Sequence, residues 1–434
     1  MLTNNRRSFA LVLAFLTFFH ASGALAFELN SQDEELLLKI QKDTFQYFLR
    51  MSDKETGLTR DSSQSGSPAS IAATGFSLAA FAIAHHRSWI DREYAYAYLE
   101  KTLKTLLYKA EHKKGFFYHF LDPRSAKRTW ASEASTIDTA LLIAGALLAA
   151  QYFPDTKIEE MAYKIYARAD WAWMLNQSSN LICMGWKPES GFLPYYWDSY
   201  NELIILQALA IGSPTHAVSQ DVWQAWFRNE DEYRGKPVVY SYSGSLFTYQ
   251  YAQAFIDFRQ LDDHGINYFQ NSINATLANR EYSLSHQLQH KSYTPQSWGL
   301  TASLGPGGYR AYGGKPGEGL HDGTIAPSAA IGSIVFTPDE SLQAIRYFYT
   351  SYPEQLYGRF GFKDAFNLDK GWFAHEYLGI DQGISLLMLE NFLQEGFLWE
   401  KFMQLVPIQR WIKLCRLLRD DGRVAATAPP ATSF

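Results

Sequence analysis

The chain has 434 residues, with 39 basic and 44 acidic side chains and a formal net charge of −5. This surplus of acid leaves no positive charge to neutralise a phosphate backbone, which argues against a nucleic-acid partner. Two cysteines, Cys183 and Cys415, are too few for a disulfide-built scaffold. Whether they pair stays open, because the sequence does not give the distance between their Cα atoms.

Aromatic residues make up 16% of the chain, more than a core of this size requires. Some of these rings are therefore expected to line a surface or a groove. Flat rings with polar tips suit sugars, which present C–H faces and a rim of hydroxyl groups.

Residues 1–26 have the three regions of a signal peptide. Arg6 and Arg7 form a positive start, Ala10 to Phe19 are mostly apolar, and Ala24-Leu25-Ala26 is a small-x-small cleavage pattern. The apolar run is much shorter than the ~20 residues that a membrane span needs. We expect cleavage before Phe27 and a periplasmic or secreted protein without a membrane span; the secretion route, general or twin-arginine, stays open.

The mature chain is expected to be mostly helical, because apolar residues recur at spacings of three and four. Some of the segments, such as 140–148, are apolar nearly all round, as buried helices are, whereas 91–110 and 156–176 have one charged face. An alternation of inner and outer helices is what a double ring requires, and no fixed repeat of 20–50 residues supports a solenoid instead. The sequence thus predicts an all-α (α/α)6 toroid of about twelve helices, at 31–51, 70–87, 91–110, 135–152, 156–176, 199–211, 219–227, 245–260, 267–287, 324–334, 338–351 and 377–397.

Three long loops rich in glycine and aromatic residues interrupt these helices, at 185–200, 298–323 and 357–377. Loops of this length in a compact domain are usually functional. No Pro/Ser-rich linker divides the chain, so one domain is expected over residues 27–405. Residues 406–434 are predicted to form a tail that is partly disordered.

Three acids stand in the first turns of helices that otherwise belong in the core: Asp138, Glu202 and Asp381. Each could simply cap its helix, because acids favour helix N-termini by roughly 0.3–1 kcal/mol. In a toroid, however, the starts of successive inner helices converge on one end. Glycoside cleavage needs such a meeting of carboxyl groups, one protonated to give a proton and one ionised to activate water.

Glu202 is the best candidate for the acid, because Tyr195-Tyr196-Trp197 and an apolar helix give it a dry setting that raises a carboxyl pKa. Asp381 lies beside glycines that permit close approach, which suits the base, with Asp364 as the fallback. Candidate substrate contacts are Glu133, Asp138, Arg60, Asp61, Tyr200, Trp298, Asp364 and Trp372. Arg60 and Asp61 could instead form a local ion pair, and about half of Trp130, Trp186, Trp197, Trp298 and Trp372 are expected to line a groove.

Other chemistries find little support in the sequence. The 11 histidines are scattered without an HExxH or CxxC spacing, and His119 is interpreted as a packed histidine. Gly314-Lys315 is followed by Pro316, which a phosphate-binding loop would not have, and no G-x-S-x-G elbow is present. We therefore expect no metal and no cofactor.

Five motifs resemble the glycoamylase-like family, which includes bacterial endo-β-1,2-glucanases and a domain of cyclic β-1,2-glucan synthases. The resemblance runs from about Phe45 to Trp399. The motifs are Ser135-Thr136-Ile137-Asp138-Thr139-Ala140-Leu141-Leu142, Ala210-Ile211-Gly212-Ser213-Pro214-Thr215-His216, Trp298-Gly299-Leu300-Thr301-Ala302-Ser303, Asp322-Gly323-Thr324-Ile325-Ala326-Pro327 and Gly379-Ile380-Asp381-Gln382-Gly383.

The resemblance implies an (α/α)6 toroid and an inverting mechanism, with Glu202 as the acid and Asp381 as the base. In such enzymes the acid is thought to act through a substrate hydroxyl and the base through a chain of water. Glu133 and Asp138 would be subsite residues. Leu304 departs from the acid expected there in many relatives, which leaves the local subsite and the glucan bound undecided.

The expected function is thus that of an exported, monomeric glycoside hydrolase, endo-acting on β-1,2-glucan. Two alternatives stay open: a glucan transglycosylase on the same site and a non-catalytic periplasmic glucan-binding protein. A polysaccharide lyase would need a basic cluster for uronate carboxylates, which the sequence lacks.

Overall fold

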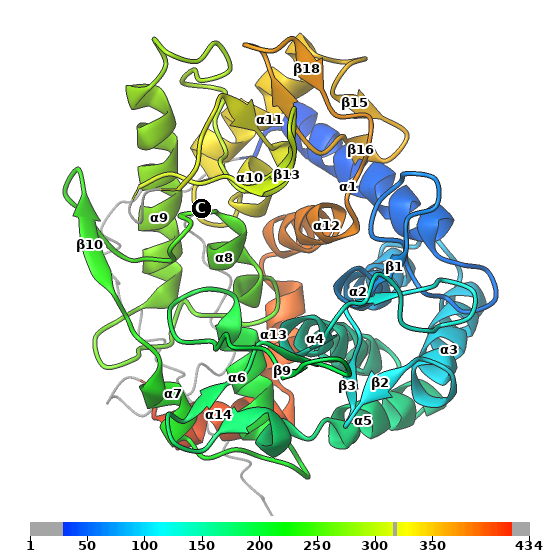
Figure 1. Ribbon diagram of the computed structural model, residues 1–434. Helices are drawn as coiled ribbons and strands as arrows, with labels where there is room; N and C mark the ends of the chain where they lie inside the picture. Colours follow the sequence, from blue (N-terminus) through cyan, green and yellow to red (C-terminus); the bar gives the residue numbers. More distant parts are fainter. Residues whose placement is uncertain (1–28, 316–318, 419–434) are drawn as a thin grey trace, which may run out of the picture.

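The computed structural model describes residues 29–315 and 319–418. The predicted signal peptide and residues 419–434 of the predicted tail lie outside these ranges. Within them the chain forms an (α/α)6 toroid (Figure 1), as predicted. Among the helices described there, none has the length and apolar character to cross a bilayer.

The inner ring is built from helices that have no polar face. All ten residues of α6 are buried, and so are the first fourteen of α2. A helix that is apolar on every side must pack on every side, so these segments form the wall of the barrel. The inner helices are α2 (Ile71–His86), α4 (Thr136–Tyr152), α6 (Leu203–Gly212), α8 (Phe247–Gln250, followed by a 3-10 turn at Ala252–Ala254), α10 (Pro327–Gly332) and α12 (Gly379–Leu393).

The outer helices bury one face and expose the other, as α5 does with its alternating apolar and charged positions. The 245–260 segment, predicted as one helix, breaks into α8 and the 3-10 turn. The outer helices are α1 (Ser31–Met51), α3 (Arg92–Tyr108), α5 (Lys157–Arg168), α7 (Asp221–Ala225), α9 (Tyr268–Ser285) and α11 (Pro338–Ser351), with α13 (Phe397–Met403) and α14 (Val406–Cys415) added at the end of the chain.

The inner helices α2 and α4 touch backbone to backbone at two glycines. A Cβ atom on Gly145 would lie 1.9 Å from the carbonyl oxygen of Gly75, closer than any side chain tolerates. Glycine at both positions therefore permits this helix pair to approach as closely as it does.

Most loops at one end of the ring form short β-hairpins, which periodicity cannot reveal because their strands have only two to four residues. Several strands run directly into inner helices: β1 into α2, β5 into α4. The paired strands are β1 (Ala69–Ser70) with β4 (Phe120–Leu121), β2 (His112–Lys113) with β3 (Phe116–Phe117), β5 (Ala134–Ser135) with β8 (Gly185–Lys187) and β9 (Gly191–Phe192), β6 (Leu175–Asn176) with β7 (Leu181–Ile182), β10 (Glu230–Tyr233) with β11 (Lys236–Val239), β12 (Ala302–Gly305) with β13 (Gly308–Ala311), β14 (Thr324–Ile325) with β17 (Phe366–Asn367) and β18 (Trp372–Phe373), and β15 (Tyr357–Gly358) with β16 (Gly361–Phe362).

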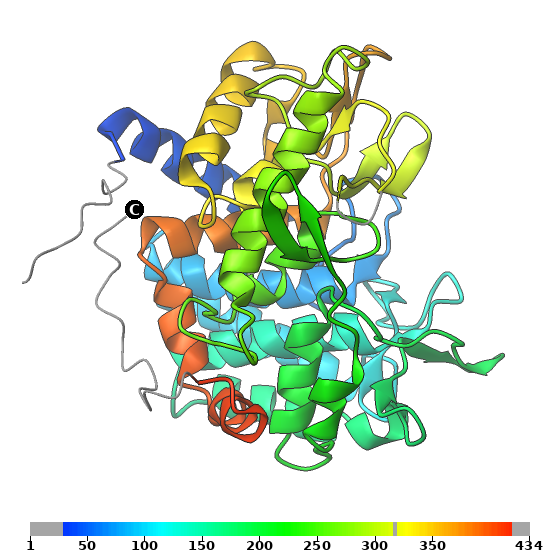
Figure 2. The ribbon, with the colours of Figure 1, turned by 90° about the vertical axis from the view of Figure 1, so that its left-hand side faces the viewer.

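Most of these hairpins project from one end of the barrel, on the right in Figure 2, whereas α13 lies towards the opposite end. Because β1 and β5 lead into the N-termini of α2 and α4 at this end, the acids at the starts of several inner helices come together there. The candidate site therefore lies at the end of the barrel that carries the hairpins.

The packed structure continues past the predicted domain end at residue 405. Helix α14 begins at Val406 and packs on α6, and its Trp411 and Ile412 are buried. Residues 406–418 therefore belong to the toroid, contrary to the predicted tail. Cys415 on this helix and Cys183 are both buried and both free thiols.

Candidate functional site

A cavity of about 890 Å³ opens at the N-terminal end of the inner helices. Its wall combines carboxyl groups with aromatic rings, the surface that a sugar chain requires. The acids are Asp61, Asp138, Glu202 and Glu376, and the rings are those of His119, Phe120, Trp130, Phe247, Tyr251, Tyr309 and Trp372.

Glu202 lies on this wall at the start of α6 but does not cap the helix. Its side chain makes no cap hydrogen bond, and the Leu203 amide instead donates to Asn201 Oδ1 at 2.8 Å. Burial, with a smaller contribution from the nearby Asp138 carboxylate, raises the pKa of the Glu202 carboxyl to about 7. Near neutral pH this group can therefore give up a proton, as a general acid must.

Asp381 and Asp364 form a buried carboxyl pair beside this cavity, not on its wall. They line a separate small cavity of about 10 Å³ with Ser328, and each is 2% exposed. Asp381 Oδ1 accepts a hydrogen bond from Ser328 Oγ at 3.1 Å, and Asp364 Oδ2 accepts one from the Leu304 amide at 2.6 Å.

Burial raises the pKa of both carboxyl groups, and the two groups hydrogen-bond to one another. The pKa of Asp364 is raised further by the charge of Asp381, whereas hydrogen bonds from Asp364 and then Ser328 act to lower that of Asp381. These causes favour the proton on Asp364 and the ionised form on Asp381.

Tyr251 lies near both acidic centres, Glu202 and the Asp381–Asp364 pair. Its hydroxyl is buried, which raises its pKa, and the charges of Asp381 and of Glu202 raise it further. Both carboxyl groups thus lie within electrostatic reach of one side chain at the same end of the barrel, and the tyrosine ring forms part of the cavity wall.

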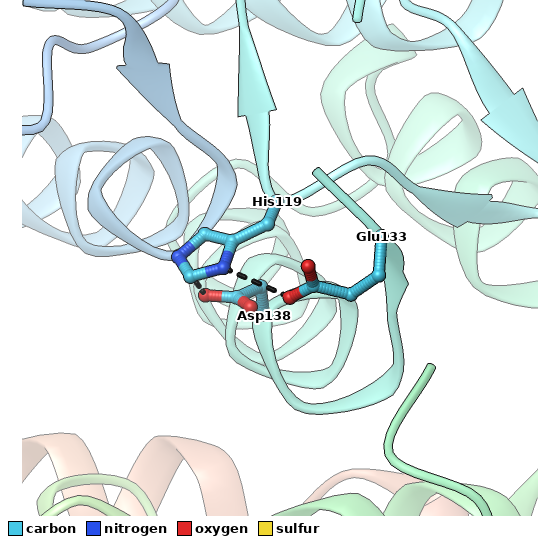
Figure 3. Close-up of side chains that lie close together, drawn as sticks. All are labelled: His119, Glu133 and Asp138. Carbon is cyan, nitrogen blue, oxygen red and sulfur yellow. Dashed lines mark hydrogen bonds and ion pairs between the residues drawn. The ribbon is translucent and has the colours of Figure 1, made fainter. Parts of the chain in front are cut away.

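His119 lies on the cavity wall among carboxylates, contrary to the interpretation as a packed histidine (Figure 3). Its Nδ1 lies 3.1 Å from Glu133 Oε1, and its Nε2 lies 3.6 Å from Asp138 Oδ1. Burial acts to lower its pKa, but Asp138, Glu133 and Asp61 together raise it to about 9. The ring is therefore an imidazolium at neutral pH.

His119, Glu133 and Asp138 also have the residue types of a metal site, with one ligand atom from each within 4.8 Å of the others. An imidazolium, however, carries a proton on both nitrogens and offers no lone pair to a metal. Its positive charge offsets one of the two negative charges, so without a metal the three side chains form an ion-pair cluster.

Four of the predicted site residues line the large cavity: Asp61, Asp138, Glu202 and Trp372. Burial raises the pKa of Asp61 to about 6, and the charge of His119 opposes that shift. Glu133 lies just behind the wall and reaches it through His119.

Three predicted substrate contacts lie elsewhere. Tyr200 is buried in a ring cluster with Tyr249 and Tyr268, and Trp298 is fully buried. Arg60 is not among the residues that line the cavity; its guanidinium donates to the Ser67 carbonyl at 2.7 Å and braces the loop that carries Asp61. Aromatic content alone did not distinguish core rings from wall rings; of the five tryptophans considered, Trp130 and Trp372 line the cavity.

Sequence reasoning missed Phe120, Tyr251, Tyr309 and Glu376 on the wall. Tyr309 lies on the β12–β13 hairpin opposite Leu304, which also faces the cavity. The glycine-rich composition of residues 305–323 indicated a functional loop but not which ring points inward.

Comparisons with known proteins show relatives of this fold. Residues 194–406 match the family model Glycoamylase, described as "Putative glucoamylase". A crystal structure of the same description from Bacteroides uniformis is 31% identical, with a TM-score of 0.84, over 89% of this chain and 98% of that one. The endo-β-1,2-glucanase from Chitinophaga pinensis, solved with sophorotriose and glucose, is 28% identical, with a TM-score of 0.82, over 88% and 98%.

A curated relative from Parabacteroides distasonis is named exo β-1,2-glucooligosaccharide sophorohydrolase (non-reducing end). It is 27% identical over 88% of this chain, which spans 58% of that protein's length. The fold, the ordered motifs and the coverage of the Bacteroides uniformis structure lead to one conclusion: this chain belongs to the glycoamylase-like family.

Proposed function

We propose that the protein is a glycoside hydrolase that cleaves β-1,2-glucan or its oligosaccharides by inversion. The observation that carries this proposal is the Glu202 carboxyl, with its pKa raised to about 7, on the wall of an aromatic-lined cavity of about 890 Å³. The linkage is supported by the names of the relatives from Chitinophaga pinensis and Parabacteroides distasonis.

In this proposal Glu202 is the general acid. It gives its proton towards the leaving glycosidic oxygen, directly or through a substrate hydroxyl, as the C–O bond breaks. The apolar start of α6 keeps the carboxyl protonated until that moment, and the Asp138 carboxylate makes its ionisation in the free enzyme costlier.

Asp381 is the proposed base. It accepts the proton of the water molecule whose oxygen attacks the anomeric carbon, so that one proton leaves Glu202 and another arrives at Asp381. Since Asp381 does not line the large cavity, this transfer needs at least one relaying water. The small cavity beside it, about 10 Å³, has the volume that one water requires. Asp364 is the donor that supports the ionised form.

Asp61, Asp138, Glu133 and Trp372 are proposed to hold the sugar chain, with the carboxylates accepting from hydroxyl groups and the indole covering a C–H face. The chemistry needs no cofactor. We further propose that the protein is a monomer and that it acts after export, in the periplasm or outside the cell.

The direct test is release of reducing sugar from a panel of glucans of defined linkage. Wild type should act on β-1,2-glucan, and Glu202→Gln should reduce turnover by about 10²–10⁴-fold, the usual contribution of general acid–base catalysis. Glu35→Gln, at an exposed position on α1, is the matched control and should keep full activity.

Equal turnover of Glu202→Gln and wild type would show that Glu202 is not the acid. Absence of hydrolysis with every linkage would reject the enzyme itself in favour of a binding protein. The products distinguish the three modes of action that remain. Endo cleavage gives mixed lengths, exo cleavage gives one short product, and transglycosylation gives lengthened or cyclic chains.

A further inference from the structure

Trp130 is a large apolar side chain that the fold leaves uncovered. Its indole is 66% exposed at the rim of the cavity, in the loop between β4 and β5. An indole this exposed gains little from burial, so its position calls for another explanation.

The backbone at this position is strained. Trp130 has φ 55° and Ala131 has φ 48°, both in the left-handed region that glycine favours. Such a conformation costs roughly 1–2 kcal/mol for each non-glycine residue. Two in succession persist only where the surroundings hold them, and residues of this kind cluster at functional sites.

The loop is held from both sides of Trp130. Before it, the Arg128 guanidinium forms a bidentate pair with Glu189 and also donates from Nε to the Ser132 carbonyl at 2.6 Å. After it, Ser132 Oγ lies 3.2 Å from both the amide and the carbonyl of Phe120. These hydrogen bonds hold the loop that carries the Trp130 ring. Less conformational entropy is therefore lost on binding than with a flexible loop.

The rings of Trp130, Phe120 and His119 pack in a row, with the Trp130 indole at the exposed end. It packs edge-on to Phe120, with centroids 5.1 Å apart, and Phe120 stacks on His119 at 3.9 Å. His119 in turn pairs with Asp138 beside Glu202. Phe120 and His119 thus lie between the exposed ring and the acid cluster.

We propose that Trp130 is a stacking platform for a glucosyl unit remote from the scissile bond, and that it determines preference for longer chains. This inference rests on the proposed function. The flat apolar ring would cover the C–H face of one sugar while the acids at the cavity's centre engage the bond to be cut. Its binding energy is realised only by substrates long enough to reach the rim.

The test compares kcat/KM on purified linear β-1,2-glucooligosaccharides of increasing length. In Trp130→Ala the ratio of kcat/KM for long over short chains should fall about tenfold, the loss of one stacking contact. Trp130→Phe should restore part of it. Tyr108→Ala removes an exposed ring at the end of α3, 75% exposed and outside the cavity wall, and should leave the ratio as in wild type.

A ratio unaltered by Trp130→Ala would overturn the inference, and because it is a ratio, partial misfolding does not affect it. A second measurement separates this outcome from failure of the proposed function. Glu202→Gln and Glu202→Gln/Trp130→Ala are run in native gels containing β-1,2-glucan. Weaker retardation of the double variant supports the platform even without hydrolysis; equal or absent retardation of both rejects it.

Discussion

At the scale of the residue, Glu202 shows how a carboxyl group at a helix start can be something other than a cap. Asp138, the third residue of α4, exchanges hydrogen bonds with the N-cap residue Ser135, so part of its role is to close that helix. Glu202 has no such bond, and Asn201 supplies the oxygen instead. The Glu202 carboxyl thus does not cap the helix, and burial in the cavity wall disfavours its charged form.

That cost makes stability depend on pH. The pKa of Glu202 is about 7 in the folded protein and near 4.5 when unfolded, so the folded state binds the proton more tightly. The stabilisation is full below the unfolded value and is lost as pH rises towards 7. Glu202→Gln cannot ionise, so its melting temperature relative to wild type should rise between pH 5 and pH 8. A constant difference across this range would contradict the raised pKa.

The same groups predict the pH profile of the reaction. Glu202 must be protonated and Asp381 ionised, so kcat/KM should fall as pH rises through about 7. It should also fall on the acid side at a pH above the ordinary carboxyl range, because burial raises the pKa of Asp381. A profile that stays flat up to pH 9 would argue against Glu202 as the acid.

Amide variants can separate the roles of the two paired carboxyl groups, Asp381 and Asp364. Asp381→Asn removes the proposed base and should reduce turnover by about 10²–10⁴-fold. Asp364→Asn can still donate to Asp381, as the protonated acid does, so it should keep far more activity. Turnover numbers of the two purified variants decide this, and the reverse order would make Asp364 the base.

At the scale of the element, the contact between α2 and α4 depends on a pair of glycines. Gly145→Ala would place its Cβ against the Gly75 carbonyl, and neither backbone can move aside without shifting its helix. We expect a loss of about 1–3 kcal/mol in the free energy of unfolding, the usual cost of overpacking.

Denaturant unfolding of Gly145→Ala measures this loss. The control is Gly307→Ala, whose new Cβ would have as its nearest neighbour, at 3.2 Å, only the end of the Arg310 side chain. An unfolding midpoint for Gly145→Ala equal to that of the control would mean that the two helices separate without cost.

At the scale of the whole molecule, the ring is completed by the last described helix. Trp411 on α14 is fully buried and packs edge-on to Trp223, with centroids 5.2 Å apart. Trp411→Ala should therefore cost about 3–5 kcal/mol and lower the melting temperature of the entire domain. Val406→Ala, at a residue 74% exposed on the same helix, should not. If Trp411→Ala melted like wild type, α14 would be an appendage, as the sequence suggested.

The toroid itself could be predicted because the buried face of a helix follows from the spacing of apolar residues within that helix. The spacing of apolar residues identified most helices within a few residues, and the helices without a polar face became the inner ring. The same logic placed Asp138 and Glu202 at the mouth of the barrel. It failed at 406–418, where the composition of the terminal segment concealed a helix with a buried face.

By itself, the sequence determined the class of fold, its inner and outer helices and the acids at their starts, since these follow from neighbours along the chain. Only the tertiary structure decided which side chains reach the cavity. Asp364 receives its hydrogen bond from Leu304, 60 residues away, and Asp381 receives one from Ser328, 53 away. Loop residues take their direction from such distant partners, which no local pattern records.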